Sequence, residues 1–154
     1  MAESLEKFFY PKSVVVIGAS ATPHKPGNDV IRNIQVNDFQ GKMYLVNPKG
    51  EEIMGMKAYP SVKDIPETVD LAIVILPASA NPQAIRECAA KGIRAIVLAA
   101  GGFSEVDEKG GNLQQELLQA IQETGVRVLG HPVPIITNNS AVCSAMAELK
   151  PGIK

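Results

Sequence analysis

Short apolar runs alternate with amphipathic segments along most of this chain, and this alternation constrains the fold more than any other feature. Five runs are expected to be strands, and they cover residues 14–17, 42–46, 69–76, 93–99 and 126–129. The segments 28–36, 81–91 and one that ends before Gly125 carry apolar residues at helical spacing. Parallel strands need crossover connections, and crossover helices cover both faces of a sheet. The sequence therefore predicts an α/β fold, a Rossmann-like, doubly wound and mostly parallel five-stranded sheet with helices on both faces.

The length of 154 residues suits one domain with its own core. We expect residues 1–130 to form the Rossmann-like domain. Residues 131–154 contain three prolines and show no clear periodicity. We expect this tail either to pack on the same domain or to begin a neighbouring element.

The composition argues against several classes of function. A net charge of −1 provides no broad positive field for nucleic acid. The apolar runs are shorter than the roughly 20 residues of a membrane-spanning helix, and no secretory leader is recognisable. Cys88 and Cys143 lack metal-ligand spacing, so we expect no metal site, no disulfide framework and a buried, reduced Cys88. We predict a cytoplasmic protein without nucleic-acid or membrane partners, and a homo-oligomer is left open.

The loop after the first strand has the composition of a phosphate-binding turn. Gly18-Ala19-Ser20 ends the strand, and a helix follows after His24 and Lys25. Glycine lets the backbone approach an anion, while the helix presents free N–H groups and the positive end of its dipole. A tight turn without a ligand is the alternative for Gly18, and Ser20 either donates to a phosphate or stabilises the loop.

The exit of the second strand narrows the choice of ligand. Ser20 replaces the second glycine of the dinucleotide fingerprint, and the next glycine is Gly27. NAD enzymes carry an acidic residue at the end of the second strand, but this sequence has Asn47-Pro48-Lys49. A cation there favours a ligand with an extra phosphate near the ribose, a condition that coenzyme A and NADP both meet.

Two further strand exits are expected to reach the same edge of the sheet, because ligands bind beyond the carboxyl ends of parallel strands. They are Pro77-Ala78-Ser79 and Ala100-Gly101-Gly102-Phe103. The sequence shows no catalytic constellation. His131 stands between glycine and proline without a recognisable Ser, Asp or Cys partner, so we predict a structural role for it.

Several ordered motifs carry a family resemblance. Residues 8–20, Phe-Phe-Tyr-Pro-Lys-Ser-Val-Val-Val-Ile-Gly-Ala-Ser, resemble the opening of the CoA-binding domain of NDP-forming acyl-CoA synthetases. Residues 41–49, 58–66 and 69–78 are similar to that family in the same order. The family includes ADP-forming acetyl-CoA synthetases and the α subunit of succinyl-CoA synthetase. One departure is that His131 follows Gly130 where the family usually has Gly-Pro-Asn-Cys.

The resemblance implies a CoA site at matching positions. Gly18, Ala19, Ser20 and Ala21 would form the first phosphate loop, with Lys25 beside it. Asn47, Pro48 and Lys49 would meet the adenosine bisphosphate end, and Pro77, Ala78, Ala99, Ala100 and Gly101 would line the path of the nucleotide and pantetheine. In complete synthetases a phosphorylated histidine on a later domain carries the phosphoryl group, so the resemblance implies no catalytic residue in this chain.

These observations favour a module that binds CoA or acyl-CoA, either alone or with the partner domains or subunits of an NDP-forming synthetase. We expect such a module not to be catalytic by itself. One alternative is an NAD(P)-dependent oxidoreductase or redox sensor on the same fold. The other is a non-catalytic regulatory or assembly domain.

Overall fold

A parallel sheet forms the centre of the molecule in the computed structural model, which describes residues 2–99 and 107–129. Within these residues the strand order is β3-β2-β1-β4-β5-β6. The strands are β1 (Ser13–Ile17), β2 (Lys42–Val46), β3 (Ala58–Tyr59), β4 (Leu71–Val74), β5 (Ala95–Leu98) and β6 (Arg127–Leu129). The predicted Rossmann-like architecture is confirmed, but the expected count of five strands is wrong. The additional strand, β3, has two residues and is too short to produce a recognisable apolar run.

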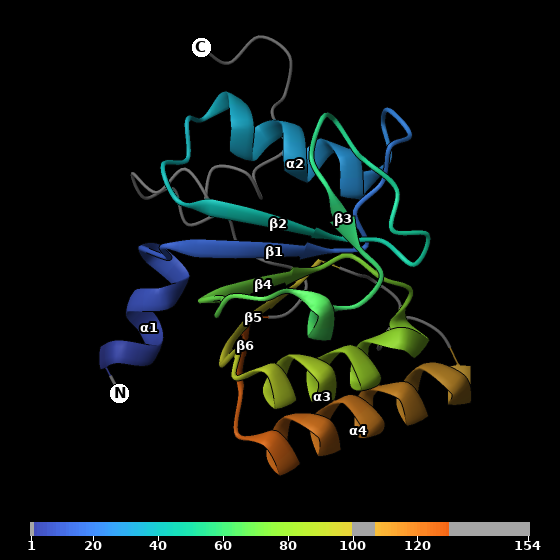
Figure 1. Cartoon of the computed structure of the whole chain (residues 1–154). Coiled ribbons are helices and arrows are strands. Elements are labelled where there is room, and N and C mark those ends of the chain that lie inside the picture. The colour runs from blue at the N-terminus through green and yellow to red at the C-terminus, as the bar shows by residue number, and fades with distance from the viewer. Residues whose placement is uncertain (1, 100–106, 130–154) are drawn as a thin grey trace, which may run out of the picture.

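Helices cover both faces of this sheet, as predicted. They are α1 (Ala2–Phe9), α2 (Pro26–Val36), α3 (Asn81–Lys91) and α4 (Asp107–Thr124), with short 3-10 turns η1 (Val62–Asp64) and η2 (Ala78–Ala80). Helix α2 lies on one face, and α3 and α4 lie side by side on the other (Figure 1). The sequence analysis did not predict α1, whose Phe8 is buried in the same core cluster as Ile31 of α2.

The central strand β1 supplies both halves of the core. All five of its residues are buried. Because side chains alternate along a strand, Val14 and Val16 join the cluster under α2, whereas Val15 and Ile17 join the cluster under α3 and α4. Burial on both faces explains why this strand is a continuous β-branched run.

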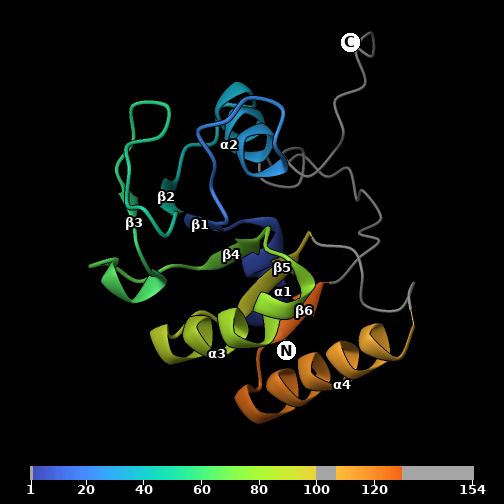
Figure 2. The same cartoon turned by 90° about the vertical axis from the view of Figure 1, so that its right-hand side faces the viewer.

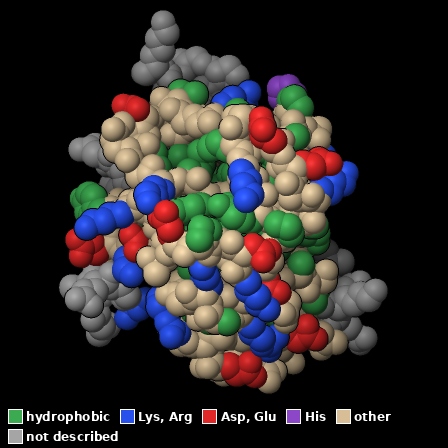
Figure 3. Space-filling model, viewed as in Figure 1, with side chains coloured by type: hydrophobic (Ala, Val, Ile, Leu, Met, Phe, Trp, Pro, Cys, Tyr) green, Lys and Arg blue, Asp and Glu red, His purple; other side chains and the backbone are tan. Residues whose placement is uncertain are grey.

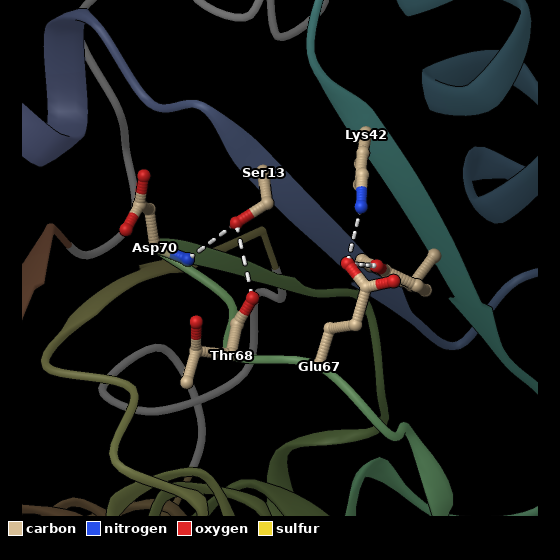
Figure 4. Close-up of polar contacts among 6 residues, drawn as sticks. Ser13, Lys42, Glu67, Thr68 and Asp70 are labelled. Atoms are coloured by element: carbon tan, nitrogen blue, oxygen red, sulfur yellow. Dashed lines mark hydrogen bonds and ion pairs between the residues drawn. The ribbon is translucent and has the colours of Figure 1, made fainter.

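Polar contacts tie together the amino-terminal ends of the strands (Figure 4). The Ser13 hydroxyl accepts a hydrogen bond from the Asp70 amide at 2.9 Å and donates to the Thr68 carbonyl at 3.4 Å. Nearby, the Lys42 ammonium group pairs with Glu67. These contacts lie at the edge of the sheet opposite the strand exits.

Candidate functional site

The exits of β1 and β2 form one hydrogen-bonded unit. The amides of Gly18 and Ala19 both donate to the Val46 carbonyl, at 3.2 and 3.1 Å. The Asn47 side chain donates in return to the Ala19 carbonyl at 2.9 Å. The glycine loop and the Asn47 turn are therefore fixed relative to each other.

The exits of β4 and β5 continue the same edge. The Ile75 amide donates to the Ile17 carbonyl at 2.7 Å, and the Ala99 amide donates to the Val74 carbonyl at 2.9 Å. Figure 2 views the molecule from the side toward which the arrows of β1 and β2 point. The structure thus brings the predicted exits together up to Ala99, and Ala100 and Gly101 lie outside the described residues. Pro77 and Ala78 follow β4 at this edge, where Ala78 begins η2.

Two glycines let α2 and β4 approach the loop closely. Gly18 has a φ of +98°, and a Cβ there would lie 2.0 Å from the Ile75 carbonyl oxygen. A Cβ on Gly27 would lie 2.0 Å from the Gly18 carbonyl oxygen. Gly27 therefore allows the close helix packing that the third glycine of the dinucleotide fingerprint allows, although its spacing from Gly18 differs from the fingerprint. The sequence analysis missed this role, and the only signal was a glycine directly after Pro26 at the start of a helix.

The glycine loop carries two backbone donors that no other described residue uses. The amides of Ser20 and Ala21 make no hydrogen bond to another described residue. The Ser20 hydroxyl oxygen accepts from the Thr22 amide at 3.1 Å, and the Asn28 side chain donates to the Ser20 carbonyl at 3.0 Å. Because a hydroxyl both accepts and donates, Ser20 stabilises the loop as an acceptor and still has a hydrogen to donate. The exposed Lys25 stands just before α2, whose N-terminus favours an anion.

The turn after β2 presents the second cation. The Lys49 amide donates to the Asn47 side-chain oxygen at 2.8 Å, and the Gly50 amide donates to the Asn47 carbonyl at 2.9 Å. The same Asn47 side chain holds the glycine loop, so it joins the two elements. Pro48 and Lys49 are exposed at this turn. Loop amides, a helix N-terminus and two exposed lysines fit a ligand with several phosphates.

A cavity of about 310 Å³ opens beside this edge, on the face of the sheet that carries α3. This volume is near the lower end of the 300–1,000 Å³ that is usual for ligand pockets. Apolar residues form most of its wall, including Ile17, Val46, Pro48, Pro60, Val62 and Leu76. Its polar lining includes Ser61, Gln83 and Glu87. The space-filling view shows hydrophobic side chains gathered across the middle of one face, among scattered charges (Figure 3). Sequence reasoning missed Pro60, Gln83 and Glu87, because only the tertiary fold brings η1 and α3 together.

The described residues offer little for metal or thiol chemistry. Among residues 2–99 and 107–129, no group of three His, Cys, Asp or Glu side chains is placed to hold a metal ion. Cys88 is a free, buried core residue, as predicted, and burial raises the pKa of its thiol to about 12. In the same part of the chain, no helix is long and apolar enough to cross a membrane.

The fold and site define a nucleotide-binding α/β domain with a glycine loop that departs from the dinucleotide fingerprint. The family model of the CoA binding domain matches residues 12–139. The chain belongs to this family and is a CoA-binding domain.

Curated relatives agree with this assignment. The chain is 41% identical over 150 residues to the ADP-forming acetate–CoA ligase II of Archaeoglobus fulgidus, a match that covers 97% of this chain and 22% of that protein. It is 40% identical over 142 residues to the α subunit of the ADP-forming acetate–CoA ligase II of Pyrococcus furiosus. This match covers 92% of this chain and 31% of that subunit. The chain therefore spans between about a fifth and a third of the length of these relatives.

Solved structures share the same architecture. The apo form of a dinucleotide-forming acetyl-coenzyme A synthetase 1 of Ca. Korarchaeum cryptofilum matches with a TM-score of 0.76 and 38% identity, over 82% of this chain and 27% of that chain. A conserved hypothetical protein of Pyrococcus furiosus matches with a TM-score of 0.61 and 26% identity, over 78% of this chain and 93% of that one. The domain thus resembles both one part of a large synthetase and a solved chain of similar size.

Proposed function

We propose that this chain is the CoA-binding module of an NDP-forming acyl-CoA synthetase and positions the thiol for acyl transfer. The observation that carries the proposal is the joined carboxyl edge, where Asn47 holds the glycine loop and the Lys49 turn together. The names of the relatives support a ligase that forms acyl-CoA. As a further part of this proposal, residues 1–130 are the folded unit, and the module works in the cytoplasm with synthetase partner domains or subunits.

In this proposal each part of CoA has a place among the donors of the site. The pyrophosphate lies over the free amides of Ser20 and Ala21, at the N-terminus of α2 and beside Lys25. The 3′-phosphate of the ribose meets Lys49, because that cation follows β2 where an acidic residue would meet a free ribose hydroxyl. The pantetheine arm then runs along the exits of β4 and β5, past Ala78 toward Ala99, which Ala100 and Gly101 follow in the sequence.

The module supplies position rather than a catalytic side chain. The sulfur of CoA attacks the carbonyl carbon of an acyl phosphate formed on a partner. A C–S bond forms, the bond from that carbon to the phosphate oxygen breaks, and inorganic phosphate leaves while the thiol proton passes to solvent. Holding the thiol at the correct place makes this step effectively unimolecular. The isolated chain is therefore expected to bind CoA and to show no synthetase turnover.

Thermal melts with CoA, acetyl-CoA, NADH and NADPH test this function. A ligand that binds only the native state stabilises it by RT ln(1 + [L]/Kd), which is about 2.7 kcal/mol at a hundredfold excess over Kd. We expect CoA and acetyl-CoA to raise the Tm of the folded chain. A shift with NADH or NADPH but not with CoA would support an oxidoreductase or redox sensor instead. No shift with any of them, together with a stable partner complex, would support an assembly domain.

Lys49 provides the sharper prediction. Hydrogen bonds to charged groups contribute about 1.5–3 kcal/mol, so Lys49→Ala is expected to weaken CoA binding by about tenfold or more. Dephospho-CoA lacks the 3′-phosphate, and its affinity should be the same for the wild type and the variant. Lys12→Ala, at the opposite edge of the sheet, is the matched control. Equal CoA affinities for wild type and Lys49→Ala, measured by calorimetry, would remove Lys49 from the site.

A further inference from the structure

The cavity beside the glycine loop has a polar pair on α3. Gln83 and Glu87 are one helical turn apart, and both line the cavity. The Gln83 side-chain amide donates to a Glu87 carboxylate oxygen at 3.3 Å. Pro48 and Pro60 belong to the apolar part of the wall. The cavity thus combines apolar surface with one hydrogen-bonding edge.

Glu87 is half-buried in the wall of the cavity. Its side chain forms no ion pair with a cation in the described part of the chain. A carboxylate beside the phosphates of CoA would oppose binding, because like charges repel in a partly desolvated site. The same carboxylate favours binding if it meets a hydrogen-bond donor of the ligand. An ionised carboxylate is an acceptor only, so the ligand group that faces it carries N–H or O–H.

We propose that Glu87, held by Gln83, recognises the adenine base of CoA through the exocyclic N6 amino group. The inference rests on the proposed function. Adenine has apolar faces for the walls and a polar edge for the pair. A carboxylate that accepts from an exocyclic base amine, and a glutamine that binds adenine, are both established modes of base recognition in nucleic-acid complexes.

The position of the cavity selects adenine over the pantetheine arm. Pro48 lines the cavity and immediately precedes Lys49, the group assigned to the 3′-phosphate. In CoA the adenine and the 3′-phosphate are attached to the same ribose, whereas pantetheine lies beyond the pyrophosphate. The volume of about 310 Å³ accommodates one part of the ligand rather than the whole of it.

Deamino-CoA, in which hypoxanthine replaces adenine, tests this assignment. It carries a carbonyl oxygen in place of the N6 amino group and an N–H at N1, with almost no change in shape. We expect calorimetry on the wild type to show that the affinity for CoA is about tenfold or more higher than the affinity for deamino-CoA. A tenfold preference lies near the lower end of what one specific base contact provides. Glu87→Gln should bring the two affinities to within about threefold, because an amide both donates and accepts. Glu116→Gln, on the exposed surface of α4, should keep the full preference of the wild type.

The outcomes separate this inference from the proposed function. Equal binding of CoA and deamino-CoA by the wild type overturns the role of Glu87 but leaves CoA binding intact. A full preference for CoA in folded Glu87→Gln also overturns it. Failure of the folded wild type to bind either compound refutes both proposals. The comparison of the two ligands on the wild type needs no variant, so it remains decisive even if Glu87→Gln does not fold.

Discussion

Gly27→Ala tests the contact on which the geometry of the phosphate loop depends. The added Cβ would lie 2.0 Å from the Gly18 carbonyl oxygen, whereas ordinary contact begins at 3.4 Å. The loop and α2 would have to separate by about 1.4 Å, and the neighbouring atoms are backbone that cannot rotate away. Inserting a methyl group into such a packed site costs about 1–3 kcal/mol.

Conformational entropy acts in the opposite direction in this variant. Replacing glycine by alanine at a compatible position stabilises a protein by about 0.4–1 kcal/mol through the unfolded state. The net expectation for Gly27→Ala is therefore a destabilisation of about 1–2 kcal/mol. For a chain of this length each kcal/mol corresponds to roughly 2–4 °C, so the Tm should fall by roughly 2–8 °C. The steric and entropic effects have opposite signs, so the direction of the Tm change shows which of the two is larger.

Ligand binding gives a second measure of the same perturbation. A loop shift of more than 1 Å moves the amides of Ser20 and Ala21 out of hydrogen-bond range of a bound phosphate. Losing one such charged bond weakens CoA binding by about tenfold. Calorimetric titration with CoA and scanning calorimetry of the same samples measure both effects.

Gly92→Ala is the control for this experiment. A Cβ at Gly92 meets no atom within 4 Å, but its φ of +93° places alanine in the left-handed region. We expect Gly92→Ala to lose about 1–2 kcal/mol of stability through backbone strain and to keep the CoA affinity of the wild type. If Gly27→Ala melts at or above the wild-type temperature with unchanged CoA affinity, the steric argument for Gly27 is refuted.

Two further predictions concern titratable groups away from the site. Hydrogen bonds from Lys42 and Tyr44 lower the pKa of Glu67 below its ordinary value of 4.5. These hydrogen bonds stabilise the fold at pH values above the pKa of Glu67 in the unfolded chain. Their contribution is lost as the pH falls through the lower pKa of Glu67 in the folded protein. Between about pH 7 and pH 3 the Tm of the wild type should therefore fall more than that of Glu67→Gln, and parallel Tm curves would contradict the argument. Burial raises the pKa of Cys88 to about 12, so iodoacetamide at about pH 8 should modify it only after unfolding. Mass spectrometry of the peptide that contains Cys88 measures this protection, and equal rates in the native and unfolded protein would be inconsistent with a buried thiol.

The sequence alone determined most of the alternation of strands and helices, and it indicated the sheet edge at which a ligand is expected. Two signals were local. The β-branched run of β1 reflects burial of the strand on both faces, and Gly92 ends α3 because its backbone is left-handed there. The ordered motifs around Gly18 and Lys49 were sufficient to indicate a CoA-binding domain.

Only the tertiary structure decided how those parts meet. The two-residue strand β3 is held by its pairing with β2, and no local pattern predicts it. Helix α1 does carry an amphipathic pattern that sequence reasoning missed, and only the fold shows that its Phe8 joins the core cluster of α2. The steric role of Gly27 depends on the Gly18 carbonyl, and the bond from Asn47 to Ala19 crosses between two strand exits. Gln83 and Glu87 line the cavity only because α3 packs beside η1. Contacts of this kind depend on the three-dimensional packing of separate elements, and the residue types of a single segment do not encode which partner it will meet.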